Sequence, residues 1–135
     1  MSIETVRISA QGREQLIRLK RSTKIEHWNV LCRWAFCVSL AEKTRPPTTI
    51  IKTEGGVEMT WRTFGGSYSD VYQALLKKRC LDDGLEPTPD AMGEQLRLHL
   101  HRGLTYLATN KQTGSIGDLI QRATDGSSER AFASG

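Results

Sequence analysis

The segment from about Glu26 to Glu42 constrains the fold most, because it predicts a helix that is apolar on nearly every side. One apolar stripe recurs at spacings of three and four residues and comprises Trp28, Leu31, Cys32, Ala35 and Phe36. The apolar residues outside this stripe are Val30, Trp34, Cys37, Val38 and Ala41. Such a helix is buried on several sides, and in a chain of 135 residues another copy most easily covers the second side. We therefore expect a homo-oligomer.

A short strand and a helix precede this segment. In residues 5–9, Val6 and Ile8 alternate with polar neighbours, as in a half-exposed strand. Residues from about Gln11 to Ser22 then predict a helix that packs on one side only. The order strand, helix, helix is typical of ribbon-helix-helix proteins, in which strands from two chains pair and enter the major groove of DNA. The side chains that would then point towards the DNA are Thr5, Arg7 and Ser9.

A β-hairpin is predicted after the second helix. Arg45-Pro46-Pro47 ends that helix, because proline lacks an N–H group and disfavours helical geometry in the residue before it. Ile50–Glu54 and Val57–Trp61 then flank Gly55-Gly56, a pair that readily adopts the positive φ of a two-residue turn. In this register, Ile50 faces Trp61.

Two to three further helices follow. Ser69 and Asp70 offer an N-cap for a helix through Leu81, and Thr88-Pro89-Asp90 starts a helix that runs to about Asn110. A further short helix is suggested by Ile116, Leu119 and Ile120. We therefore expect a mainly α fold with a ribbon-helix-helix-like N-terminal unit (a short strand plus two helices), a β-hairpin insertion and these helices. Residues 1–123 should form a single domain, and residues 124–135 have the composition of a flexible tail.

Positive charge is concentrated near the N-terminus. Residues 1–45 carry nine Lys or Arg against four acids, a net +5, whereas the whole chain has +4. The candidate DNA-binding residues in this part are Arg7, Arg13, Arg18, Lys20, Arg21 and Lys24. A concentrated basic face is expected of a polyanion partner, because phosphate neutralisation releases condensed counterions. On charge alone, a solvated face kept basic for solubility is an equal alternative.

Lys77 and Lys78 form a second basic cluster together with Arg79. Asp82 and Asp83 follow directly and lie at spacings that allow neutralisation on a helix. A solvated helix face is the favoured interpretation. Lys77 and Lys78 would add phosphate contacts if an oligomer aligned them with the first helix.

Membrane and catalytic functions find no support in the sequence. No run approaches the roughly 20 apolar residues of a membrane span, and the first four residues do not resemble a signal peptide, so a cytoplasmic location is expected. Cys32 and Cys37 lie roughly 140° apart on a helix, and His99 and His101 roughly 200° apart, so neither pair can share a metal. The acids are explained by capping and solubility. We therefore expect no metal, no cofactor and no catalytic residue.

Several short motifs together cover most of residues 5–120, namely Leu31–Leu40, Phe64-Gly65-Gly66-Ser67-Tyr68, Ala74–Cys80, Asp83-Gly84-Leu85 and His99–Gly103. In this order they resemble the DndE family of DNA sulfur modification proteins. Their order along the chain carries more weight than any single motif. His101 departs from the pattern, where a small polar residue such as Asn is expected.

The resemblance implies a role in DNA phosphorothioation, in which sulfur replaces a non-bridging phosphate oxygen. It implies a ribbon-helix-helix relative that forms tetramers and binds nicked duplex DNA through basic surface residues. It also implies DndC-like and DndD-like partners, an ATP-pyrophosphatase-like protein and an SMC-like ATPase, and indirectly a cysteine desulfurase.

The residues and the resemblance together favour a non-catalytic DNA-binding subunit of this system. Three alternatives remain open at this point. The chain would be a sequence-specific repressor that reads bases with Arg7, a metal-dependent nicking enzyme whose site assembles between subunits, or an adaptor that docks the ATPase.

Overall fold

The computed structural model describes residues 4–109. The order of elements is β1 (Thr5–Ile8), α1 (Ala10–Thr23), α2 (Trp28–Ala41), β2 (Val57–Thr60), α3 (Trp61–Gly65), a 3-10 turn (Gly66–Tyr68), α4 (Ser69–Asp82) and α5 (Pro89–Thr109). The mainly α class and the initial strand, helix, helix order are therefore confirmed. The short helix expected after Gly114 and the tail at 124–135 lie outside the described residues.

The two strands form a small antiparallel ribbon, in which Val6 pairs with Met59 and Arg7 with Glu58. The predicted hairpin is wrong in its pairing, because Ile50–Glu54 is not a strand and β2 pairs with β1. Trp61 does not face Ile50 either, since it begins α3 and its N–H donates to the carbonyl of Glu4, just before β1, at 2.9 Å. The ribbon that the sequence placed between two chains thus forms within one chain. Val6 and Ile8 are buried beneath it, as predicted.

Gly56 explains why β2 reaches β1. A Cβ atom at this position would lie 1.7 Å from the Ile8 carbonyl oxygen, so only glycine permits this approach. Gly55 has a φ of 74° and forms the turn, where the N–H of Gly56 donates to the Thr53 carbonyl at 3.4 Å. The glycine pair therefore makes a turn, but one that directs the chain onto β1.

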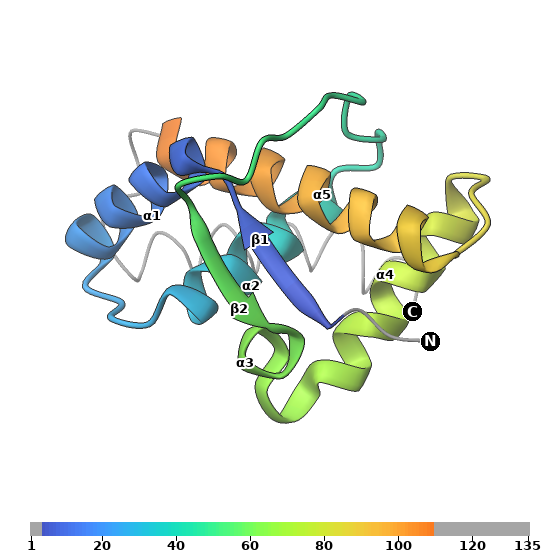
Figure 1. Ribbon diagram of the computed structural model, residues 1–135, viewed down its shortest axis with the longest axis horizontal. Helices are drawn as coiled ribbons and strands as arrows, with labels where there is room; N and C mark the ends of the chain where they lie inside the picture. Colours follow the sequence, from blue (N-terminus) through green and yellow to red (C-terminus); the bar gives the residue numbers. More distant parts are fainter. Residues whose placement is uncertain (1–3, 110–135) are drawn as a thin grey trace.

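Helices α2 and α5 form the centre of the core behind the ribbon (Figure 1). Leu31, Ala35, Leu100 and Leu104 are fully buried between them and their neighbours. Gly103 permits their close packing, because a Cβ there would lie 1.8 Å from the Ala35 carbonyl oxygen. Helix α1 lies at one end of the molecule in Figure 1 and α4 at the other.

An aromatic group joins α2, α3 and α4. The Phe36 ring meets Phe64 at 5.9 Å and Tyr72 at 6.1 Å between centroids, both edge to face. Gly66 follows α3 with φ 59° and ψ −140°, a conformation that is essentially restricted to glycine. The glycines of the Phe64–Tyr68 motif therefore serve the turn from α3 into α4.

Candidate nucleic-acid interface

The outward face of α1 carries most of the candidate basic residues. Arg13, Arg18, Lys20 and Arg21 are exposed, while the opposite side of α1 buries Leu16 and Leu19. Glu14 is the only acid in this helix. Within residues 4–109, none of these four cations takes part in an ion pair. Their charges are therefore available to a polyanion.

Lys24 extends this face at the C-terminal end of α1. It has a φ of 65°, and its N–H closes the helix by donating to the Lys20 carbonyl at 3.0 Å. This left-handed position is usually occupied by glycine, because a side chain there costs roughly 1 kcal/mol.

Helix α1 is fixed to α5 through His101 and Gln15. The Ser9 N–H donates to Nε2 of His101 at 3.0 Å, and Nδ1 of His101 donates to the Arg97 carbonyl at 2.7 Å. Gln15 Nε2 donates to the Thr105 hydroxyl at 3.2 Å. Desolvation by burial lowers the pKa of His101, so the neutral ring that both hydrogen bonds require is favoured.

The ribbon carries the other predicted contact, Arg7, together with an opposing acid. The guanidinium of Arg7 lies 3.6 Å from the Glu58 carboxylate on the outer face, where Thr5 and Thr60 form the adjacent pair. This outer face therefore has no net charge. Ser9, which was expected to point at DNA, caps α1 instead, because its hydroxyl accepts from the Gly12 N–H at 3.0 Å.

The second basic cluster is largely neutralised, as its spacing predicted. Lys78 Nζ lies 2.8 Å from the Asp82 carboxylate, and Arg79 lies 3.2 Å from Asp83. Lys77 is exposed and forms no ion pair within the part of the chain that the structure describes.

Arg79 and Arg102 have a structural role that the sequence did not reveal. Arg79 donates to the carbonyls of Leu40, Glu42 and Thr44, and Arg102 to those of Ser39 and Thr44. These carbonyls belong to the end of α2 and the chain after it, which lack helical donors. No local pattern identifies such contacts, since they join residues 35 to 63 positions apart.

A buried Ser39 and His99 pair resembles a catalytic dyad but is inaccessible. The Ser39 hydroxyl accepts from Arg102 Nε at 2.8 Å, so its proton is directed to His99 Nδ1, also at 2.8 Å. Both residues are fully buried. Burial, with Arg79 and Arg102 nearby, lowers the pKa of His99 to about 3. A substrate has no access to this hydroxyl, and we assign the pair to packing.

Residues 4–109 contain neither a cluster of metal ligands nor a membrane-spanning helix. No three His, Cys, Asp or Glu side chains there lie together in a way that would hold a metal ion. Cys32, Cys37 and Cys80 are free thiols, and burial raises the pKa of Cys32 to about 12. No helix in this range is long and apolar enough to cross a membrane.

The fold and this surface define a mainly helical protein that starts with strand, helix, helix and presents a basic helix. The chain matches the family model "DNA sulphur modification protein DndE" over residues 5–115, and it therefore belongs to the DndE family. A crystal structure of DndE from Escherichia coli B7A, described as involved in DNA phosphorothioation modification, has the same fold with a TM-score of 0.66. Its sequence is 24% identical, and the match covers 77% of this chain and 97% of that one. A comparison with curated proteins finds no match.

Proposed function

We propose that this chain is a non-catalytic DNA-binding subunit of the phosphorothioation machinery and that α1 contacts the phosphates of duplex DNA. The supporting observation is the exposed outer face of α1, where Arg13, Arg18, Lys20 and Arg21 have no acidic partner among the described residues. Lys24 continues this face. Phosphate contacts of this kind hold a duplex without reading its sequence.

The remaining candidates contribute less to this proposal. The charge of Arg7 is offset by Glu58, 3.6 Å away, which reduces its attraction for a phosphate and also weakens the repressor alternative. Lys78 is bound to Asp82, whereas Lys77 is available. The DndC-like and DndD-like partners, the cysteine desulfurase and a preference for nicked DNA are part of the proposal through family membership.

We also propose that the chain forms a tetramer. Exposed apolar side chains at α4 support this self-association. Val71 and Leu75 of α4 are exposed and lie four residues apart, which places them on one face, and Tyr68 is exposed just before the helix. Cys37 of α2 is exposed as well, and Trp34 is half-buried. Because α1 and α4 lie at opposite ends of one copy, Lys77 can join the α1 face only through another copy.

The test removes three charges from α1 and compares the result with an equal loss elsewhere. With Arg18, Lys20 and Arg21 all changed to Ala, the dissociation constant for a duplex should rise at least about tenfold at low salt. The dependence of log affinity on log salt should flatten by about 0.9 for each lost phosphate contact. Fluorescence anisotropy across a salt series measures both quantities.

The matched control changes Lys43, Arg45 and Arg62 to Ala. These residues are exposed and lie outside α1, so net charge falls by the same amount. We expect at most a two- to threefold change in affinity. Equal losses for both variants would show that only net charge matters, and unchanged binding by the α1 variant would refute the proposal. If the protein instead nicks supercoiled plasmid in a reaction that requires magnesium, the metal-dependent nicking enzyme becomes the favoured alternative.

A further inference from the structure

The segment Thr48–Lys52 has the composition of a β-strand but forms none. Four of its five residues are β-branched, the type that most favours extended structure. The structure gives it no strand assignment. Ile50 is 91% exposed, which is the highest value among the exposed large apolar side chains of residues 4–109.

The backbone of this segment lacks hydrogen-bond partners. Within residues 4–109, no N–H or C=O group from Thr48 to Lys52 bonds to another group. Water satisfies such groups at a surface, but a row of them is also a template for a further strand. The backbone groups of this segment can therefore form hydrogen bonds with a further strand.

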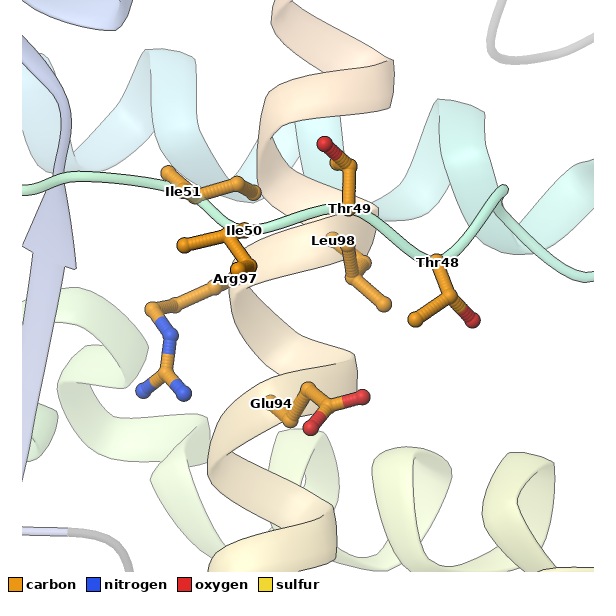
Figure 2. Close-up of a pocket in the computed structure, with 7 residues that line it drawn as sticks. All are labelled: Thr48, Thr49, Ile50, Ile51, Glu94, Arg97 and Leu98. Carbon is orange, nitrogen blue, oxygen red and sulfur yellow. The ribbon is translucent and has the colours of Figure 1, made fainter.

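Figure 2 shows that the side chains of this segment alternate in direction, as they do along a strand. The side chains of Thr48 and Ile50 lie on one side of it, and those of Thr49 and Ile51 lie on the other. The segment crosses α5 in this view and, together with Glu94, Arg97 and Leu98 of that helix, lines a cavity of about 310 Å³. Thr48, Thr49, Ile50 and Lys52 are all exposed, so the backbone of this segment has an edge that is open to solvent.

We propose that this edge pairs with the same segment of a second copy, antiparallel and with the two-fold axis at Ile50. Opposite residues of an antiparallel pair point to the same face, so a two-fold pair must be centred on a residue and not between two. Centred on Ile50, the pairing places Ile50 against its own copy and Thr49 against Ile51. Pro47 lies next to Thr48, outside the paired residues.

A second copy fits this edge in both charge and polarity. Lys52, the only charge in the segment, faces Thr48 of the partner copy, so no like charges meet. The most exposed apolar side chain is covered by an identical one. This inference deepens the proposed self-association by giving it an additional surface away from α4, and it rests on that proposal.

Cysteine cross-linking tests the register directly. In a Cys37→Ser background, which removes the exposed thiol, Ile50→Cys places two sulfurs on paired residues about 4.5–5.5 Å apart between Cα atoms, within disulfide range. The matched control Lys52→Cys lies four residues from its own copy, roughly 13 Å along the strand. Under mild oxidation, Ile50→Cys should form a covalent dimer at least about tenfold faster than Lys52→Cys.

Light scattering after size exclusion separates the possible failures. If the protein is an oligomer but Ile50→Cys cross-links no faster than Lys52→Cys, this pairing is refuted while the proposed self-association stands. If the protein is a monomer at the cross-linking concentration, both are refuted. Ile50→Lys, which sets two charges opposite each other, should weaken the oligomer at least about tenfold, and an unchanged oligomer counts against the pairing.

Discussion

Individual basic residues differ in what their charge can do, and only their contacts reveal the difference. Arg79 and Arg102 are held by carbonyl groups around the end of α2, and Lys78 by Asp82. The cations of α1 are held by nothing comparable in the described chain. The net charge of +4 therefore underestimates how strongly α1 alone can attract a polyanion.

Lys24 offers a test of function against stability at a single residue. Lys24→Gly relieves the left-handed backbone at φ 65° and should raise the free energy of unfolding by about 0.5–1 kcal/mol, measured by urea denaturation. If Lys24 binds phosphate, the same variant should bind duplex DNA several-fold more weakly. Lys20→Ala is the control, because it should weaken DNA binding without stabilising the protein. A stabilised variant that keeps full affinity would remove Lys24 from the interface.

At the scale of elements, local periodicity predicted the helices correctly. The predicted hairpin was wrong, because the pairing of β2 is decided by tertiary contacts. The predicted helix at 26–42 is found as Trp28–Ala41, and the one starting at Ser69 and Asp70 as Ser69–Asp82. Spacing within one element determines such helices. The partner of β2 depends on contacts about fifty residues away, and the fit of Gly56 against Ile8 is visible only in three dimensions.

In the candidate site too, features within one element could be predicted from the sequence, whereas contacts between distant residues could not. The exposed basic face of α1 could be predicted, because helical spacing separates it from Leu16 and Leu19. The opposing Glu58 beside Arg7 could not be predicted, because it comes from the unexpected strand pairing. The His101 contact to Ser9 spans 92 positions and was equally hidden.

The packing of α2 on α5 can be tested at Gly103. Gly103→Ala drives a methyl group into the Ala35 carbonyl, so the helices must separate, and we expect a loss of at least about 2 kcal/mol in unfolding free energy. Gly93→Ala in the same helix is the control, since its Cβ would come no closer than 3.6 Å to the Arg97 guanidinium. That substitution should stabilise the protein by about 0.5–1 kcal/mol. Equal effects would show that the close approach at Gly103 is unimportant.

On the scale of the whole molecule, the surfaces of interest are separated and the core connects them. Helix α1 lies at one end and the open apolar face of α4 at the other, with α5 extending between them (Figure 1). His101 near α1 and His99 near Arg79 are both on α5 and both buried or half-buried. Protonation of either histidine would therefore place a charge where α5 packs against the rest of the core.

Acid should destabilise the whole fold through these two histidines. Burial lowers the pKa of both, to about 3 for His99 from an ordinary 6.5, so between these values the unfolded chain binds more protons than the folded one. The free energy of unfolding should be highest above pH 6.5 and fall as the pH decreases, by up to about 1.4 kcal/mol per pH unit for each proton. Urea denaturation between pH 7.5 and pH 4.5 measures this slope.

Two substitutions test whether His99 contributes to this slope. His99→Gln removes one titrating group, so its free energy of unfolding should fall less steeply with acid than that of the wild type, whatever its stability at pH 7.5. His27→Gln changes an exposed histidine outside the core and should keep the wild-type slope. If His99→Gln retains the full slope, the acid sensitivity belongs to His101 or to carboxylates, and the buried Ser39 and His99 pair does not couple the fold to pH.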